Sequence, residues 1–355
     1  MTDKPEAGDE LTLTVKVVEA RPDGLLLVAP ANGAAGGWGV RHVHVDRLLA
    51  ACAALPPLAT AVVAPEEQNS LGGALLAARH GLIRPLLIGD AACIRSLATT
   101  LGDDLAGCEL IEVADHHAAA ERAVALVHEG RAQAIMKGHL HTDDLLRPIV
   151  RRDGGLRGRR RLSHVFVMDV PDLDHLLLVT DAAINIAPTL EEKVDIIQNA
   201  IDLGRALGMD VPRVGVLAAV EIVNPQMPAT LDAAILSKMA ERGQIVGGVV
   251  DGPLAMDNAL SLSAARTKGI TSLVAGRAQV LMTPNIEAGN MLAKELAYVS
   301  HAEGAGIVLG AQVPIMLTSR ADDDRSRLAS CAVAALYQHW RATGKSAVAA
   351  TDDPA

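Results

Sequence analysis

Short apolar runs alternate with helical patterns from about Ala50 almost to the end of the chain. Each run has the length of a buried strand, and a helical segment such as Ala118–His128 separates it from the next. Such alternation is typical of βαβ units and a largely parallel sheet, so we expect an α/β fold. The predicted strands are Ala61–Ala64, Pro85–Gly89, Glu109–Val113, Ala132–Met136, Val165–Met168, Leu176–Val179, Val214–Leu217, Ile245–Val250 and Val280–Met282.

The composition agrees with a layered α/β protein. Half of the residues are hydrophobic, yet the chain has only 1 Phe, 2 Tyr and 2 Trp. The core must therefore consist of Leu, Val, Ile and Ala side chains. A chain of 355 residues is long enough for two lobes or for one large domain.

The region before the alternation has a different pattern. Residues 11–19 alternate at period 2 and residues 24–28 are apolar, which predicts a hairpin of half-buried strands. The Gly- and Ala-rich residues 30–39 are typical of a linker. We expect residues 1–49 to form a β stub and linker, too short for a domain. The stub weakly resembles the closing strands of a hotdog-fold hydratase unit.

One helix has clear boundaries in the sequence. Thr189 and Glu192 form a capping box, and Gly208 marks the end of the helix. Its apolar face consists of Leu190, Val194, Ile197 and Ile201.

Charge and cysteine usage exclude several classes of function. The net charge of −10 and the pI of about 5.6 argue against a nucleic-acid surface. The basic run Arg157–Arg161 is either a solvated loop or a grip on an anionic, nucleotide-bearing ligand. No apolar run is long enough to span a membrane, and we expect a cytoplasmic protein. The cysteines lack metal-site spacing, as expected for reduced thiols; they are Cys52, Cys93, Cys108 and Cys331.

A phosphate site is predicted near the C-terminus. Two apolar runs within residues 304–318 are joined by a turn, and the second run leads to Ser319 and Arg320. Three aspartates, Asp322–Asp324, then precede a predicted helix over residues 325–341. A loop between a strand end and a helix start suits phosphate, because helix amides and an arginine fork can both donate to it. The alternative is an ordinary surface Ser-Arg pair.

Other polar groups also follow predicted strands. Lys137, Thr142 and Arg147 lie at a strand–turn–helix junction that either holds an anion or is a plain capped helix. Asp181 and Asn185 lie where a strand gives way to polar residues, although an Asx-turn explains them equally well. The carboxyl ends of parallel strands lie at one rim of a sheet. If the strands are parallel, these residues therefore share that rim with Glu221 and Asp251, which follow two further strands.

Several catalytic signatures are absent from the sequence. There is no G-x-x-x-x-G-K-[ST] loop and no G-x-G-x-x-G at a helix start, so nucleotide hydrolysis and dinucleotide-dependent dehydrogenation are disfavoured. Ser163 and His164 without a positioned carboxylate are weak evidence for a hydrolytic triad. No histidine cluster indicates a metal.

Taken together, the motifs resemble the phosphate acetyltransferases and phosphate butyryltransferases. The resemblance runs from roughly Ala50 to Arg341, and the forms of residues 163–165, 180–183 and 318–322 are closer to the butyryltransferases. The matching segments are Met136–Gly138 with Thr142, Leu162–Val165, Val179–Pro188, Ala219–Thr230, Gly243–Ile245, Asp251–Ala259, Glu287–Asn290 and Leu317–Asp322.

The resemblance implies a two-lobed, three-layer α/β/α fold like that of the isocitrate and isopropylmalate dehydrogenases. The implied lobes are residues 50–165 with 308–345, and residues 166–307, with the active site in the cleft between them. The second lobe would join a homodimer. The implied activity is reversible transfer of an acetyl or butyryl group between coenzyme A and inorganic phosphate, without metal or cofactor.

The resemblance also assigns roles to residues. In the family, a serine and an arginine at the positions of Ser319 and Arg320 contact phosphate and the reacting carbonyl, and an aspartate shortly after them takes the proton from the thiol. Coenzyme A thiolate would then attack the acyl phosphate directly in a ternary complex. The candidate substrate-binding residues are Lys137, Thr142, Arg147, Ser163, His164, Asp181, Asn185 and Asp251.

The chain departs from the family pattern at the base. Ser326 stands where the aspartate is usual, seven residues after Ser319. A short deletion in the loop would bring Asp324 to that position, and we expect Asp324 to be the base while Asp322 or Asp323 caps the helix. Otherwise the base is lost, and the chain is a non-catalytic member that binds coenzyme A or acyl phosphate. The family commonly has Asp at the position of Gln279, and this difference concerns a local hydrogen bond more than the chemistry.

Overall fold

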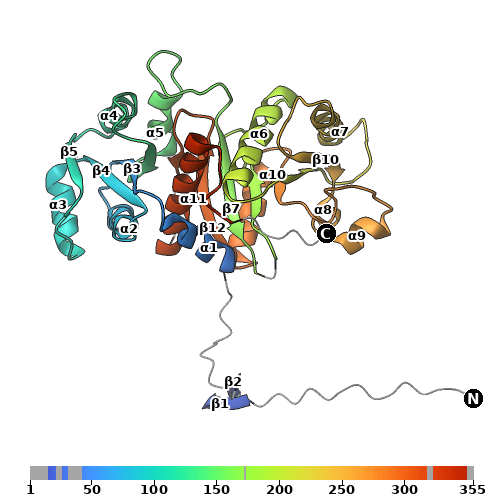
Figure 1. The fold of residues 1–355 in the computed structure, drawn as a ribbon, viewed down its shortest axis with the longest axis horizontal. Coiled ribbons are helices and arrows are strands. Elements are labelled where there is room, and N and C mark those ends of the chain that lie inside the picture. Colours follow the sequence, from blue (N-terminus) through green and yellow to red (C-terminus); the bar gives the residue numbers. More distant parts are fainter. Residues whose placement is uncertain (1–14, 21–25, 31–41, 172, 318–322, 350–355) are drawn as a thin grey trace, which may run out of the picture. The chain divides into compact units, whose positions relative to one another are not determined.

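The computed structural model describes residues 15–20, 26–30, 42–171, 173–317 and 323–349 (Figure 1). By its contacts the chain forms two units, residues 1–41 and 42–355. In the first unit, β1 (Val15–Ala20) and β2 (Leu26–Pro30) pair antiparallel, with Val17 opposite Val28. The predicted hairpin is confirmed for these strands. The predicted linker, residues 30–39, lies almost wholly outside the described residues, as do residues 11–14 and 24–25 of the hairpin.

Eleven strands of the second unit form one sheet, in the order β10-β9-β11-β8-β7-β12-β13-β6-β3-β4-β5. The strands are β3 (Leu58–Val63), β4 (Ile83–Gly89), β5 (Glu109–Glu112), β6 (Ala134–Lys137), β7 (Ser163–Asp169), β8 (Leu177–Thr180), β9 (Arg213–Leu217), β10 (Val249–Leu254), β11 (Val280–Met282), β12 (Glu303–Leu309) and β13 (Ile315–Met316).

Helices cover both faces of this sheet, which gives the expected three layers. The helices are α1 (Val43–Cys52), α2 (Gln68–Arg79), α3 (Ala91–Thr100), α4 (His116–His128), α5 (Thr142–Ile149), α6 (Leu190–Ala206), α7 (Pro228–Glu241), α8 (Met256–Leu260), α9 (Leu262–Thr267), α10 (Ile286–Tyr298) and α11 (Asp324–Thr343). One continuous core packs α1, α2, α3, α6, α7 and α11 on one face. Two separate cores lie on the other face, one under α4 and α5 and one under α8, α9 and α10.

The two halves of the sheet run in opposite directions. β12 is antiparallel to both β7 and β13, and β7 is antiparallel to β8, whereas the remaining neighbours are parallel. The carboxyl ends of β8, β9, β10 and β11 therefore lie at the opposite edge from those of β3, β4, β5, β6 and β13. The expectation that all polar strand ends share one rim is wrong, and it holds only within each half.

The division of residues 50–345 into two lobes stays a prediction. β3–β6 and β13 come from residues 58–137 and 315–316, and β8–β11 come from residues 177–282. Helix α1 begins within the region predicted as stub and linker, and it packs on α11, where the Cys52 thiol lies 3.6 Å from the carbonyl oxygen of Ala332.

Local signals placed most elements well. The capping box of α6 is present, with the Thr189 hydroxyl and Glu192 carboxylate each accepting from the other's backbone amide. The predicted strand Ile245–Val250 instead begins at Val249, because Gly247 has a φ of +83° and Gly248 passes close to the carbonyl of Pro212. β9 ends at Leu217, as in the predicted strand Val214–Leu217, so Glu221 lies four residues beyond the strand. Among the described helices, none is long and apolar enough to cross a membrane.

Candidate active site

The amino end of α11 forms as the three aspartates predict. Asp323 is the N-cap, and its carboxylate accepts a hydrogen bond of 2.8 Å from the backbone amide of Ser326. This confirms that one of the first two aspartates caps the helix. Asp324 is the first helical residue, and its side chain is exposed. Ser319, Arg320 and Asp322 lie outside the described residues.

The strand that leads to Ser319 is the direct neighbour of the strand that ends at Lys137. β13 and β6 are parallel, with Met316 opposite Met136. Lys137 is 9% exposed, and its ammonium donates to the carbonyl oxygens of Gly138 at 3.3 Å and Leu140 at 3.2 Å. Its charge is therefore held inside the turn at the same sheet edge from which the Ser319 segment departs.

The other two residues of that junction face different surroundings. Thr142 is the first residue of α5 and is half-buried. The Arg147 side chain is 66% exposed, and its guanidinium lies 3.8 Å from the Asp144 carboxylate. Exposed pairs of this kind contribute little to stability, so Arg147 is free to turn toward an anion in solution.

Asp181 and Asn185 organise a loop. Asp181 is 1% exposed, and its carboxylate accepts from the backbone amides of Ala183, Ile184 and His164 and from the Asn185 side chain, at 2.5 to 3.1 Å. The Asn185 amide also donates to the carbonyl oxygen of Leu162. An Asx-turn does exist here, but Asp181 forms it rather than Asn185. With every oxygen of Asp181 engaged, its carboxylate holds the loop after β8 against the start of β7.

Ser163 and His164 do not form a catalytic dyad. They are adjacent residues of β7, so their side chains point to opposite faces of the sheet. The Ser163 hydroxyl accepts from the Asn199 amide at 2.9 Å. Burial lowers the pKa of His164 to about 4, although the nearby charge of Asp181 acts in the opposite direction. The imidazole is therefore neutral at pH 7, and its ring packs edge-on against Phe166 at 4.4 Å.

A cavity of about 240 Å³ lies beside the amino end of α11, and we call it the α11 pocket. Its lining comes from β7, α10, β12 and the start of α11, namely Phe166, Met168, Ala293, Lys294, Ala297, Tyr298, Ala302, Gly304, Gly306, Asp323 and Ser326. A Cβ at Gly306 would lie 3.1 Å from His164 Nε2 and 3.1 Å from the carbonyl oxygen of Leu317. The chain thus passes this pocket just before Ser319.

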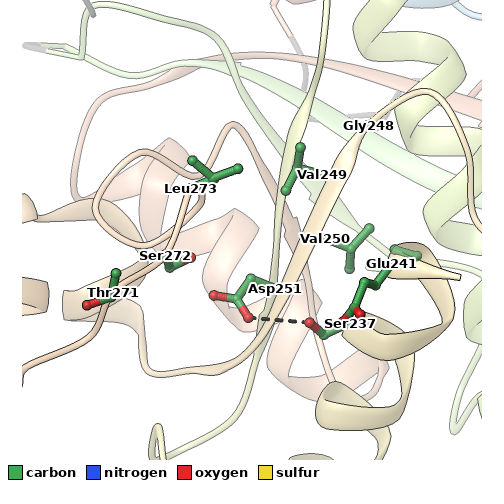
Figure 2. Close-up of a pocket in the computed structure, with 10 residues that line it drawn as sticks. Ser237, Glu241, Gly248, Val249, Val250, Asp251, Thr271, Ser272 and Leu273 are labelled. Atoms are coloured by element: carbon green, nitrogen blue, oxygen red, sulfur yellow. Dashed lines mark hydrogen bonds between the residues drawn. The ribbon is translucent and has the colours of Figure 1, made fainter.

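Asp251 belongs to a different place. It lies on β10, at the far edge of the sheet, and lines a cavity of about 390 Å³ between α7 and the loop of residues 271–273 (Figure 2). Its carboxylate accepts from the Ser237 hydroxyl at 3.4 Å and from the backbone amide of Gly252 at 2.8 Å. β9, β11, β8 and β7 lie between β10 and β12, so Asp251 does not join the residues around α11.

Sequence patterns did not single out the apolar wall of the α11 pocket. Phe166 and Met168 are alternate residues of a strand, and Ala293 and Ala297 are one helical turn apart, so they read as ordinary core positions.

The sequence left two interpretations of the basic run Arg157–Arg161, a solvated loop or a grip on an anionic ligand. In the structure Arg160 lies 2.5 Å from Asp202 and Arg161 lies 2.7 Å from Glu192, so two of its charges are already paired. Within the described part of the chain, no cluster of His, Cys, Asp and Glu could hold a metal ion.

Comparisons with known proteins point to one family. The family described as phosphate acetyl/butaryl transferase matches residues 116–335. A phosphate acetyltransferase of Rhizobium meliloti is 56% identical over 84% of this chain and 95% of its own length. A phosphate butyryltransferase of Clostridium acetobutylicum is 43% identical over 78% of this chain and 92% of its own. Of these two, the acetyltransferase is the more similar, whereas the motif forms alone favour the butyryltransferases.

Solved structures agree in fold. A branched-chain phosphotransacylase from Enterococcus faecalis superposes with a TM-score of 0.69 at 30% identity, covering 79% of this chain and 99% of that one. A phosphotransacetylase from Streptococcus pyogenes has a TM-score of 0.70 at 21% identity, covering 84% and 98%. The three-layer α/β/α architecture is therefore shared with the phosphotransacylases.

Proposed function

Since the chain belongs to the phosphate acetyl/butyryl transferase family, we propose that it transfers an acetyl or butyryl group reversibly between coenzyme A and inorganic phosphate. One observation carries the proposal: at 56% identity, the match spans 95% of a protein named phosphate acetyltransferase. Nearly the whole of that protein has a counterpart here. The family match covers β13 and the first part of α11.

The reaction needs few protein groups. The coenzyme A sulfur attacks the carbonyl carbon of the acyl phosphate, a C–S bond forms, the C–O bond to phosphate breaks, and inorganic phosphate leaves. Ser319 and Arg320 would hold the phosphate and the carbonyl oxygen, where charge develops. Their position three to four residues before the N-cap Asp323 supports this role, because the amino end of a 20-residue helix favours an anion.

The thiol proton needs an acceptor. An ordinary thiol has a pKa of about 8.5 and is only a few per cent ionised at pH 7. We keep Asp324 as the proposed base, since it is one residue into the helix and has no capping task. Asp323 is its rival, because its carboxylate lines the α11 pocket while also capping the helix.

The remaining assignments are also proposals. Lys137 at the end of β6 and Thr142 at the start of α5 would complete the anion site, and Arg147 would add attraction from the surface. Ser163, His164, Asp181 and Asn185 would act indirectly, by holding the loop and strand beside the pocket. We further propose a homodimer, a cytoplasmic location and no requirement for a cofactor.

The direct test follows thiol release from acetyl-CoA and butyryl-CoA when phosphate is added. We expect turnover with at least one of the two, dependent on phosphate. Absence of turnover with every short acyl-CoA, together with measurable coenzyme A binding by calorimetry, would instead identify a non-catalytic binding member that has lost its base.

A further inference from the structure

The buried part of the α11 pocket is apolar. Met168, Ala293 and Gly306 are buried in its wall, and Phe166 is half-buried beside them. The charged and polar members are at the rim, where Lys294, Tyr298 and Asp323 are exposed. A phosphate or a nucleotide deep in this cavity would be left without hydrogen-bond donors from these buried side chains, so the inner part suits a hydrocarbon.

The pocket also lies at the proposed reaction centre. Leu317, two residues before Ser319, has its carbonyl oxygen 3.1 Å from where a Cβ of Gly306 would stand. Asp323, three residues after Arg320, lines the pocket itself. Of the two described ends of the Ser319–Arg320 stretch, one therefore lines this cavity and the other lies beside its lining residue Gly306, whereas the larger cavity at Asp251 lies on the far edge of the sheet.

We propose that the α11 pocket receives the acyl chain of the substrate, and that Phe166 and Ala297 set the chain length it accepts. The proposal rests on the proposed function. A cavity of about 240 Å³ equals about eight water molecules at ~30 Å³ each, enough for a butyryl chain with room to spare. Phe166 forms one wall from β7, and the small side chain of Ala297 leaves space on the α10 side.

Two glycines of β12 belong to the lining of the pocket. Gly304 and Gly306 line the pocket from the strand, and a Cβ at Gly304 would lie 3.0 Å from the Met168 sulfur. A Cβ at Gly306 would likewise lie 3.1 Å from His164 Nε2, so both glycines let β12 lie close to side chains of β7.

The test compares kcat/KM for acetyl-CoA, butyryl-CoA and hexanoyl-CoA with phosphate in three variants. Ala297→Leu fills the cavity from a half-buried helical position, and we expect the butyryl to acetyl ratio of kcat/KM to fall about tenfold or more, in line with the discrimination available from one or two methylenes. Phe166→Leu enlarges it, and the hexanoyl to butyryl ratio should rise. Ala118→Leu, an exposed position in α4, is the matched control and should leave both ratios unchanged.

Ratios within one variant cancel losses from imperfect folding. If Ala297→Leu and Phe166→Leu lower kcat/KM equally for all three substrates, the acyl chain binds elsewhere and the inference is overturned, while wild-type turnover leaves the proposed function standing. If the wild-type protein turns over none of the three, the proposed function fails, and the inference fails with it.

Discussion

At the scale of single residues, Arg320 carries the largest predicted effect. A charge-assisted hydrogen bond contributes about 1.5 to 3 kcal/mol, and a preorganised donor to developing charge contributes more. Arg320→Ala should therefore lower kcat/KM by about 10²-fold, measured with saturating coenzyme A and varied acyl phosphate. Arg320→Lys should not restore the rate, because lysine lacks the planar fork. Normal kcat with normal KM for acyl phosphate in the alanine variant would contradict the role of this residue.

The pH dependence of the rate in variants of two neighbouring aspartates shows which one accepts the thiol proton. Asp324→Asn should lose rate at pH 7 and recover part of it near pH 9, where the thiol ionises unaided. Asp323→Asn keeps a side-chain oxygen that can accept from the Ser326 amide, so the cap survives and the variant is a fair comparison. A full rate in Asp324→Asn combined with the pH-dependent loss in Asp323→Asn would move the base to Asp323.

The lowered pKa of His164 predicts that the protein loses stability in acid. Its folded pKa of about 4 lies below the ordinary 6.5, so between these values the unfolded chain binds the proton more readily. The stabilisation is complete above pH 6.5 and is lost as the pH falls toward 4, by about 3 kcal/mol. Urea unfolding between pH 7 and pH 4.5 should show a falling free energy of unfolding. His164→Leu should make that free energy depend less steeply on pH. An NMR titration of His164 near 6.5 in the folded protein would contradict the burial argument.

At the scale of elements, the turn from β6 into α5 depends on Gly138. A Cβ there would clash with the carbonyl oxygens of Val63 and Ala64, and Ala64 already has a φ of 50°. Because backbone atoms cannot move aside cheaply, Gly138→Ala should lower the free energy of unfolding by about 1 to 3 kcal/mol and displace Lys137. Gly72→Ala in α2 is the control, since its nearest neighbours would lie at 3.9 Å. Equal free energies of unfolding in urea for the Gly138→Ala and Gly72→Ala variants would contradict the close approach of Gly138 to the backbone of Val63 and Ala64.

At the scale of the whole molecule, residues 1–41 form a unit apart from residues 42–355. The second unit holds the sheet, the helices and every described residue assigned to the site. Deletion of residues 1–41 should therefore leave the melting temperature unchanged and kcat/KM within about twofold of that of the full chain, since the described hydrophobic cores consist of residues of the second unit. A truncated protein that unfolds at lower temperature or loses turnover would show that the first unit supports the second.

What the sequence determined by itself was local in origin. Thr189 and Glu192 identified a capping box, the aspartates before α11 predicted a cap at Asp322 or Asp323, and period-2 and apolar runs located the strands. These signals act between residues a few positions apart. The resemblance added the family, since its motifs span most of the chain. The tertiary structure decided the rest. The antiparallel contacts of β7 and β12 reversed half of the sheet and separated Asp251 from α11, because strand direction depends on partners more than a hundred residues away. Tertiary packing likewise decided that Asp181 holds the loop after β8 and that Phe166 lines the α11 pocket. Burial and hydrogen-bond partners arise only when segments that are distant in the sequence come together.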